Sequence, residues 1–594
     1  MSMLPDLKER FRRALAGMGL EASEWLEMIR RSQDPKFGDY QANMAMPLGK
    51  RLGRSPRQLA AEIAARLELA DFCHPPEVAG PGFINLRIRD DWLVERLQAA
   101  AAEERLGIPP VARPRTFVID FSAPNVAKPM HVGHIRSTVI GDALGRTLRF
   151  LGHRVISDNH VGDWGTQFGM IIYGYKHFLD REAYGRDPVG ELARLYRLVR
   201  QLLDRAGEGA ESEPEGEASG GPSEIRRAVL AETARLHVGD AENHRLWQEF
   251  MPHCLREIER MYRRLHVEFD YSLGESFYND MLPGLVDELL RRGIARESDG
   301  AVCIFLEGQA APMIVRKHSG GFLYATTDLA TIQYRLERWQ PEVILYVVDH
   351  RQGLHFQQLF EAARRLGHRE VELVHVSFGT VLGEDGRPFR TRSGDTVGLE
   401  GLLDEAVRRA GAIVAAGDDA KPDGPELSAH ERAEIAETVG IAALKYADLA
   451  HNRTSDYVFS YDKMLAMNGN TATYMQYAYA RVRSIFARGQ VDAEALRAAP
   501  PWVCLATPAE RALALELLRY GEALELAAAD YRPNHLTAYL FELAIRYSTF
   551  FEQCPVLKAE TLELRRSRLL LCDLTARTIR SGLELLGIRV VEKM

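Results

Sequence analysis

The sequence contains no long apolar run. No stretch approaches the roughly 18 to 20 uninterrupted apolar residues that a membrane span needs, and charged residues make up 27% of the chain. The first turns of the chain, MSMLPDLKERFRRALAGMGL, carry charges throughout and lack the apolar core of a signal peptide. We therefore expect a cytoplasmic protein that does not associate with a membrane.

Cysteine is also scarce, with six in 594 residues. No two cysteines form a Cys-x-x-Cys pair, so a structural zinc site is not expected. Their scattered spacing argues against a disulfide framework as well. We expect reduced cysteines that lie mostly in hydrophobic cores, and no metal ion held by protein ligands.

The chain has no excess of basic charge. Its formal net charge is −8, which does not by itself indicate a nucleic-acid-binding protein. Residues 207–224 hold six glutamates and no basic residue, so this segment accounts for most of the negative charge. It is too polar to bury, and we expect a disordered insertion there. The nearly neutral remainder can still carry local basic faces, which are the surfaces that phosphates contact.

The length of the chain predicts several domains. Helical patterns, a Pro-Gly turn and an alternating strand predict a small α+β domain over residues 1–110, ended by the proline-containing link GIPPVARPR. Residues 111–384 alternate strand and helix, which predicts an α/β domain of the doubly wound, Rossmann type with helical insertions. A polar loop and connection follows over 385–430. Nearly all of 431–594 has an amphipathic helical pattern, so an all-α bundle is expected.

The stretch FSAPNVAKPMHVGHIRS, which begins at Phe121, lies between an apolar strand and a helix. A helix that begins after a parallel strand presents free backbone N–H groups to an anion. His131 and His134 share one face of the first turn, where imidazoles can donate to phosphate oxygens, while Gly133 leaves room for an adenine or ribose. Lys128 can add a point charge, so the stretch predicts a nucleotide triphosphate site. The alternative is that the histidines are ordinary surface residues.

HVGH matches the HIGH signature of class I aminoacyl-tRNA synthetases, and the longer string FSAPNVAKPMHVGHIRSTVIGDAL resembles the arginyl-tRNA synthetases. The resemblance extends over essentially the whole chain. It implies a Rossmann-type catalytic domain, an N-terminal added domain that contacts the tRNA elbow, and a C-terminal anticodon-binding domain with a DALR signature. The implied enzyme of protein biosynthesis is an arginine–tRNA ligase.

The resemblance also implies a two-step reaction. L-arginine and ATP, with Mg²⁺, give arginyl-adenylate and pyrophosphate, and the arginyl group then passes to the 3′-terminal adenosine of tRNA-Arg. In-line attack on the α-phosphate needs mainly positioning and charge stabilisation from the protein. The family further implies a monomer in which activation depends on tRNA.

The second class I signature departs from its usual form. Where the family often has KMSKS, this chain has FRTRSG, with Thr391 at the position of the lysine that contacts the triphosphate. The resemblance to arginyl enzymes of this form implies that Lys128 takes over the missing role. The alternative for FRTRSG is a solvated basic loop. The predicted catalytic residues are Lys128, His131, His134, Arg390 and Arg392, and the predicted ATP-binding residues are Lys128, His131, Gly133, His134, Thr391 and Arg392.

A guanidinium requires carboxylates in a fork geometry with aromatic or amide partners. Tyr324 precedes Asp328 by one helical turn, so both can face one pocket, and the resemblance implies that this pair binds the arginine side chain. Glu275 resembles a second guanidinium-binding carboxylate, and Gln352 resembles a substrate-binding glutamine. Each of these residues could instead have a purely structural role. The α-amino and carboxylate groups of arginine are assigned to Ser122, Asn125 and His131.

Two stretches have the mixture of aromatic and basic groups that suits unstacked RNA bases. NTATYMQYAYARVRSIFARG lies in the predicted bundle, and DPKFGDYQANMAMPLGKRLG lies in the N-terminal domain. LCDLTARTIRSGLELLGI approximates the DALR signature. The alternative for the tyrosines is core packing at helical spacing. The predicted tRNA-binding residues are Phe37, Tyr40, Gln41, Asn43, Tyr474, Gln476, Tyr477, Arg481 and Met594.

Other functions share part of this pattern. Small-molecule nucleotidyltransferases also have HxGH after a strand, but they are usually much shorter and lack an all-helical C-terminal domain. A tRNA-binding relative without catalysis is disfavoured by the intact HVGH motif, Lys128 and Asp328. A class I synthetase for a neutral amino acid is disfavoured by the predicted pocket carboxylates. ATP–pyrophosphate exchange discriminates among these alternatives.

Overall fold

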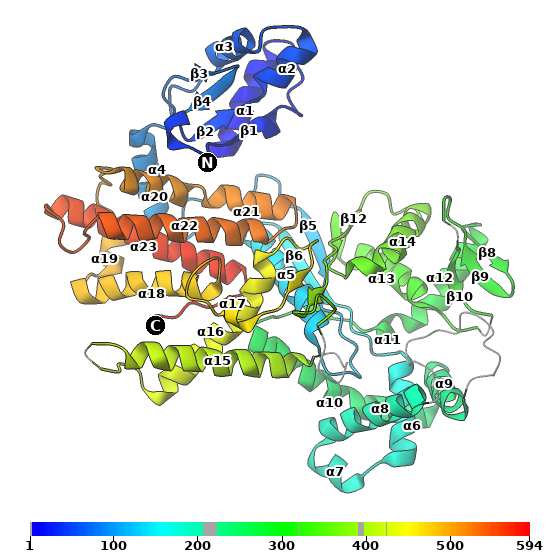
Figure 1. Ribbon diagram of the computed structural model, residues 1–594. Coiled ribbons are helices and arrows are strands. Elements are labelled where there is room, and N and C mark those ends of the chain that lie inside the picture. The colour runs from blue at the N-terminus through cyan, green and yellow to red at the C-terminus, as the bar shows by residue number, and fades with distance from the viewer. Residues whose placement is uncertain (1–2, 206–222, 310, 319, 390–396, 423) are drawn as a thin grey trace.

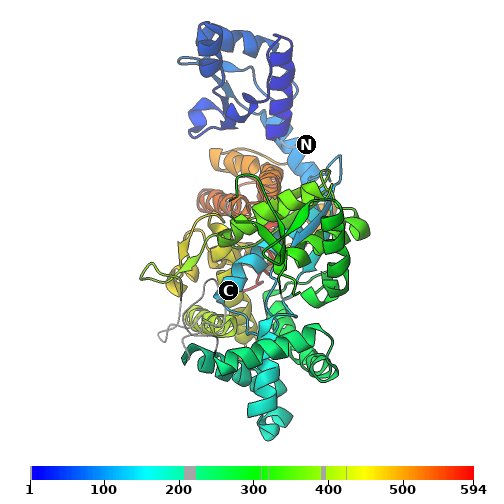
Figure 2. The same cartoon turned by 90° about the vertical axis from the view of Figure 1, so that its right-hand side faces the viewer.

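The computed structural model describes residues 3–205, 223–389 except 310 and 319, and 397–594 except 423. Figure 1 shows an N-terminal module, a central α/β part with insertions, and a C-terminal bundle of helices. In both views the N-terminal module and the helices α6–α10 lie at opposite ends of an elongated molecule (Figures 1 and 2). None of the helices in these ranges is long and apolar enough to cross a membrane.

The N-terminal module is a four-stranded antiparallel sheet in the order β1-β2-β4-β3, packed against helices. Its core includes Leu7, Phe11 and Ile84, and Leu515 of the C-terminal bundle packs into the same cluster. The module therefore docks on the bundle through apolar contact. Its elements are α1 (Met3–Ala16), β1 (Ile29–Arg31), β2 (Tyr40–Ala42), α2 (Ala45–Leu52), α3 (Pro56–Arg66), β3 (Glu77–Ala79) and β4 (Phe83–Leu86), followed by α4 (Asp90–Ala102).

A five-stranded parallel sheet in the order β12-β11-β5-β6-β7 forms the centre. Its apolar strands are covered on one face by α5 and on the other by α13 and α14, which is why they lack polar alternation. The strand order reverses between β5 and β11, and ligands of such sheets bind outside the carboxyl ends of the strands at this point. The elements are β5 (Thr116–Asp120), α5 (Val132–Phe150), β6 (Arg154–Asn159), β7 (Tyr271–Ser272), α13 (Tyr324–Trp339), β11 (Val343–Tyr346), α14 (Gly353–Arg365) and β12 (Glu372–His375).

Two insertions interrupt this sheet. The first is helical, with α6 (Thr166–Phe178), α7 (Arg181–Arg186), α8 (Pro188–Arg205), α9 (Glu224–His237) and α10 (Ala241–Leu265). The second contains α11 (Glu275–Tyr278), α12 (Leu282–Arg291) and an antiparallel sheet of β8 (Ala295–Ser298), β9 (Ala301–Ile304) and β10 (Met313–Arg316).

The predicted disordered segment 207–224 extends too far at its C-terminal end. Ser223 caps α9 by accepting a hydrogen bond from the backbone N–H of Arg226, and Glu224 is the first residue of the helix. A serine before a helix supplies an acceptor for one of the free N–H groups of the first turn. The rest of the segment, residues 207–222, lies outside the described residues.

The C-terminal third is helical, as predicted. A hairpin of α15 (Leu399–Asp419) and α16 (Ala429–Ala450) leads into the bundle, and a short parallel pair, β13 (Val381–Leu382) with β14 (Tyr457–Val458), joins it to the central part. Figure 1 shows the hairpin beside α18 and the C-terminus. The remaining helices are α17 (Tyr461–Met464), α18 (Ala472–Gly489), α19 (Ala493–Ala498), α20 (Pro508–Leu518), α21 (Tyr520–Ala529), α22 (Asn534–Gln553) and α23 (Leu562–Leu585).

Candidate active site and RNA-binding surfaces

The two motif histidines form the start of α5. His131 is the N-cap, and its Nδ1 accepts a hydrogen bond from the Gly133 backbone N–H at 3.1 Å. The Nδ1 of His134 accepts in turn from the His131 N–H at 3.0 Å. The ring centroids lie 3.9 Å apart. The two imidazoles therefore take the place of the usual capping side chains at the end of a helix that can receive an anion.

Both rings have a defined tautomer because Nδ1 is an acceptor in each. The proton of the neutral imidazole must then be on Nε2, which is a hydrogen-bond donor. Burial, with the neighbouring His131 and Lys128, lowers the pKa of His134 to about 3. His134 is therefore neutral at physiological pH and can donate to a phosphate oxygen without a fixed charge.

The loop between β5 and α5 is held by its own polar groups. Ser122 and Ala123 have φ values of 70° and 42°, a left-handed conformation that non-glycine residues rarely adopt. The Ser122 hydroxyl lies 2.8 Å from the hydroxyls of both Thr138 and Tyr262. This hydroxyl, predicted to bind arginine, is buried inside the protein. Asn125 is partly exposed, and its side-chain oxygen accepts from the Ala127 N–H at 3.2 Å.

The loop that corresponds to KMSKS ends against the HVGH motif. The Val132 N–H donates to the Val397 carbonyl at 3.0 Å, and the Leu399 N–H donates to the Met130 carbonyl at 2.9 Å. The residues that follow this loop therefore contact the HVGH motif at the start of α15. The three predicted loop residues, Arg390, Thr391 and Arg392, lie outside the described residues. The Lys128 ammonium is 5.9 Å from the centre of the Tyr196 ring and close enough to His134 to depress its pKa.

Three carboxylates from separate elements form an electrostatically coupled group near the β5–α5 loop, whose Asn125 pairs with Gly162, the residue before Asp163. Asp163 follows β6, Glu275 begins α11, and Asp328 lies on the first turns of α13. Burial, with the charges of Asp163 and Asp328, raises the pKa of Glu275 to about 8. Asp163 accepts hydrogen bonds from the backbone N–H and the hydroxyl of Ser276, which positions α11. A cluster of carboxylates that repel one another provides a strong site for a cation.

Three of the predicted arginine-binding residues lie on α13 or at the start of α14. Tyr324 is the first residue of α13 and 59% exposed, one turn before Asp328. Gln352 is exposed and directly precedes α14. One turn further along α14, the Nε2 of His355 lies 2.6 Å from Oδ2 of Asp328. The sequence prediction did not include His355, although its spacing of three from Gln352 was visible.

A second residue that the sequence prediction missed fixes α13 to the sheet. Arg335 is fully buried and donates to Asp120 at 2.7 Å and to Asp158 at 3.0 Å. These two carboxylates lie at the carboxyl ends of β5 and β6, beside the candidate site. Arg335 follows Asp328 by seven residues, on the same side of the helix. Arg335 therefore sets the position of Asp328 relative to the HVGH loop.

Comparison with known proteins identifies the family of the chain. The family model described as "tRNA synthetases class I (R), catalytic domain" matches residues 96–461. The "Arginyl tRNA synthetase N terminal domain" matches 5–88, and the "DALR anticodon binding domain" matches 475–594. The chain belongs to the arginyl-tRNA synthetase family. The HVGH motif lies within the matched catalytic domain, and the stretch that approximates the DALR signature lies within the matched anticodon-binding domain.

Individual arginyl-tRNA synthetases are similar over their full lengths. The arginine–tRNA ligase of Rhodopirellula baltica is 47% identical over 670 residues and that of Thermobifida fusca 45% over 605, with at least 99% of each chain covered. The crystal structure of the Plasmodium falciparum enzyme gives a TM-score of 0.82 at 26% identity, covering 100% of this chain and 99% of that one. The Thermus thermophilus enzyme gives 0.79 at 26%, covering 100% of both chains. The predicted fold is thereby confirmed.

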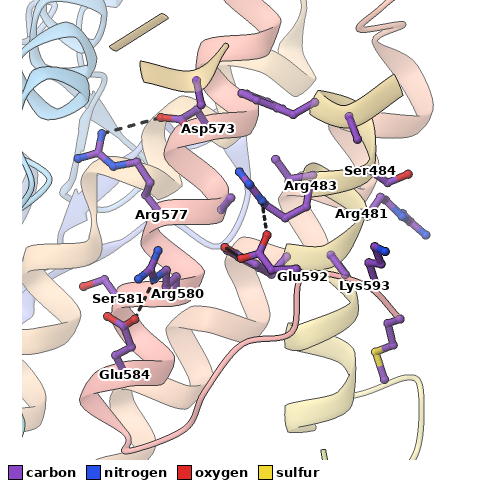
Figure 3. A pocket seen from close by; sticks show the side chains of 18 of the residues that line it. Arg481, Arg483, Ser484, Asp573, Arg577, Arg580, Ser581, Glu584, Glu592 and Lys593 are labelled. Carbon is purple, nitrogen blue, oxygen red and sulfur yellow. Dashed lines mark hydrogen bonds and ion pairs between the residues drawn. The ribbon is translucent and has the colours of Figure 1, made fainter. Parts of the chain in front are cut away.

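The DALR-type bundle of this synthetase has a large polar pocket of about 2190 Å³. α18, α23 and the C-terminal tail line it, and Figure 3 shows Arg481, Arg483, Arg577 and Arg580 around it. The pocket continues to α5, and to the loop between α15 and α16. Predicted residues that line it are Tyr477, Arg481 and Met594.

The Arg481 guanidinium and two aromatic rings form a group of flat side chains in this pocket. Its guanidinium lies 4.8 Å from the ring centre of Tyr477 and 5.0 Å from that of Phe551. Phe551, on α22, was not predicted, because no spacing in the sequence relates it to α18. The arrangement presents flat groups of the kind on which unstacked bases pack.

Two other predicted residues of the bundle do not line this pocket. Gln476 is fully buried, and its amide donates to the Arg589 carbonyl at 2.8 Å. The Tyr474 hydroxyl lies 3.1 Å from that of Ser548. Their positions indicate that Gln476 supports the C-terminal tail and Tyr474 joins α18 to α22.

The predicted residues of the N-terminal module also divide into two groups. Phe37 is 39% exposed with the Lys36 ammonium 4.7 Å from its ring centre, and Gln41 and Asn43 are partly exposed. Tyr40, in contrast, is fully buried, and its hydroxyl donates to Glu522 of α21 at 2.6 Å. Tyr40 therefore fastens the module to the bundle rather than presenting a ring to solvent.

Proposed function

We propose that this protein is an arginine–tRNA ligase that activates L-arginine with ATP and transfers it to the 3′-terminal adenosine of tRNA-Arg. The observation that carries the proposal is the meeting of two sites at the switch point of one sheet. The loop that leads to a helix N-terminus with two Nε2–H donors pairs with the segment after β6, which carries Asp163 and hydrogen-bonds to the backbone of Glu275. The first suits a triphosphate and the second suits a guanidinium. Membership of the arginyl-tRNA synthetase family supports the same assignment.

ATP enters as its Mg²⁺ complex, in which the ion belongs to the substrate. His131 and His134 donate through Nε2 to the phosphates, the N–H groups at the start of α5 add to the positive potential, and Gly133 leaves room for the nucleoside. Lys128 supplies the charge that Thr391 does not. Arg390 and Arg392 are assigned to the triphosphate as well, as the resemblance implies. These groups stabilise the charge that develops when the arginine carboxylate attacks the α-phosphate.

Arginine is held by groups at both of its ends. Asp328 and Glu275 receive the guanidinium, Tyr324 covers it, and Gln352 contributes an amide. Asn125 and His131 hold the α-amino and carboxylate groups near the α-phosphate. A neutral side chain would leave the carboxylates unpaired, which is strongly unfavourable.

The tRNA contacts both ends of the chain. Its anticodon lies in the pocket of the DALR domain, over residues 431–594, with Tyr477, Arg481 and Met594 as contacts. Its elbow meets Phe37, Gln41 and Asn43 in the domain formed by residues 1–110. Residues 111–384 form the catalytic domain, and 385–430 the KMSKS-like loop and connection. We expect a cytoplasmic monomer, as the family resemblance implies.

Activation is proposed to depend on tRNA. α5 begins at the nucleotide site and its last turns, with Arg146 and Arg149, line the pocket. α15 begins at Leu399 beside Met130, and Lys421 after its end lines the same pocket. Occupation of the pocket by tRNA therefore acts on two helices that both start at the HVGH loop.

The proposal is tested by aminoacylation of tRNA-Arg with labelled arginine and ATP. Arginine should be attached, whereas lysine and citrulline should not. Attachment of a different amino acid, or folded protein that binds tRNA-Arg without charging it, would overturn the proposal.

A further inference from the structure

His355 connects the arginine pocket to α14. Its Nε2 lies 2.6 Å from Oδ2 of Asp328, and both side chains are largely enclosed, with 29% and 24% of their surfaces exposed. The two residues are on different helices, α14 and α13, so the contact is not a consequence of helical spacing. Such a short contact between an imidazole and a carboxylate is a charge-assisted hydrogen bond.

This contact occupies one oxygen of Asp328. Within the described residues, the other oxygen, Oδ1, makes no hydrogen bond, and the side chain remains partly open to solvent. Glu275 lies close enough to Asp328 for the charge of Asp328 to raise the pKa of Glu275. One oxygen of Asp328 is thus fixed by the protein, while the other is available beside Glu275.

We propose that His355 is a positioning residue for arginine selection: it holds Oδ2 of Asp328, so that Oδ1 and the Glu275 carboxylate converge on the guanidinium. This inference rests on the proposed function, in which Asp328 binds arginine. Without His355 the carboxylate can rotate about its last bond, and the geometry that a planar guanidinium requires is lost.

The electrostatics of the pair are consistent with this role. Burial opposes the charged form of His355, but the contact with Asp328 outweighs it, and the pKa of His355 lies above its ordinary value. The imidazole thus retains its proton on Nε2, where it donates to Asp328.

A merely structural role is disfavoured because apolar residues already join the two helices. Phe356, Leu359 and Phe360 of α14 pack in one core with Leu329 and Ile332 of α13. His355 lies at the edge of this core, partly exposed, with its ring centroid 5.3 Å from that of Phe356, so its replacement should not unfold the domain.

The test compares His355→Leu, which removes the donor, with His355→Gln, whose amide can donate from a similar position. His368→Leu, just beyond the other end of α14, is the matched control. Arginine and ATP are titrated separately in ATP–pyrophosphate exchange with tRNA-Arg present, and direct arginine binding is measured by calorimetry. The melting temperature of each variant is also recorded.

We expect His355→Leu to raise the KM for arginine by about 10-fold or more, with the KM for ATP within twofold. His355→Gln should recover most of the loss, and His368→Leu should resemble the wild type. An unchanged arginine KM and arginine affinity in His355→Leu would overturn the inference, as would equal losses for arginine and ATP. If the wild-type protein shows no arginine-dependent exchange, the proposed function fails instead.

Discussion

Single atoms set the chemistry of the two motif histidines. Because a backbone N–H donates to Nδ1 of each ring, each ring keeps its proton on Nε2. A neutral donor can hydrogen-bond to phosphate oxygens without adding a fixed positive charge beside Mg²⁺. The positive charge must then come from elsewhere, and Lys128 is the nearest described lysine along the motif.

Lys128→Ala tests that assignment. We expect the rate of arginine-dependent ATP–pyrophosphate exchange to fall by about 100-fold or more, because a charge that stabilises the triphosphate in the transition state is removed. The affinity for tRNA-Arg should stay within twofold. Lys558→Ala, in the loop between α22 and α23, serves as the control. Exchange at the wild-type rate would show that Lys128 does not replace the missing loop lysine.

Glu275 predicts a pH dependence of arginine binding. Its pKa is raised to about 8, so the carboxyl group is mostly protonated at pH 7 and ionised at pH 9. A bound guanidinium favours the ionised form, and binding must therefore release a proton. The KM for arginine should fall by about tenfold between pH 7 and pH 9, since the ionised fraction rises by that factor.

The comparison for this prediction is Glu275→Gln, whose amide does not titrate. At pH 9 this variant should bind arginine more weakly than the wild type does. Its KM for arginine should change little with pH, apart from the contribution of the Asp328–His355 pair. An arginine KM that rises with pH in the wild type would contradict the placement of Glu275 against the guanidinium.

The sequence allows a site residue to be predicted when the residue that acts with it lies within one helical turn along the chain. His131 with His134, and Tyr324 with Asp328, are examples of such local spacing. His355 and Arg335 were missed because their partners lie on other elements, and only the packing of α13 against α14 and the sheet brings them together. Tyr40 and Gln476 were predicted to bind tRNA but are buried, because the elements that bury them are distant in sequence and no local pattern shows them.

At the scale of elements, α13 is positioned by one buried ion pair network. Arg335 crosses from the helix to Asp120 and Asp158 at the ends of two strands. Arg335→Met should destabilise the central domain by about 3–5 kcal/mol, because two carboxylates remain buried without their partner. Urea unfolding measures this loss, and Arg338→Met, on the exposed side of the same helix, should change stability little. Equal midpoints for the two variants would contradict this account of α13.

The strand–helix alternation was predictable because apolar strands and amphipathic helices have different periods. The order of the strands in the sheet could not be predicted, because it depends on pairing between segments that are far apart in the sequence. The start of α9 shows a related limit. Ser223 and Glu224 share the composition of the acidic segment before them, yet the serine caps the helix. Composition alone places such a boundary two residues too late.

For the whole molecule, the notable feature is that two helices reach from the HVGH loop to one pocket. α5 has 19 residues and is about 28 Å long, and α15 has 21 residues. The fully buried Lys445 of α16 donates to the Gly587 carbonyl and to that of Leu265 beside α5, which fastens the C-terminal tail to the central part. A ligand in the pocket therefore contacts the end of α5 and the loop after α15, and both helices begin at the nucleotide site.

The central claim is that one crevice activates arginine with ATP and that tRNA completes it. The most direct test is ATP–pyrophosphate exchange with arginine, run with and without tRNA-Arg. The account predicts exchange only when arginine and tRNA-Arg are both present. Exchange without tRNA would contradict the proposed coupling through α5 and α15, but would still support the assignment as an arginine–tRNA ligase. No exchange under either condition, from folded protein, would contradict the claim that this crevice is a catalytic site.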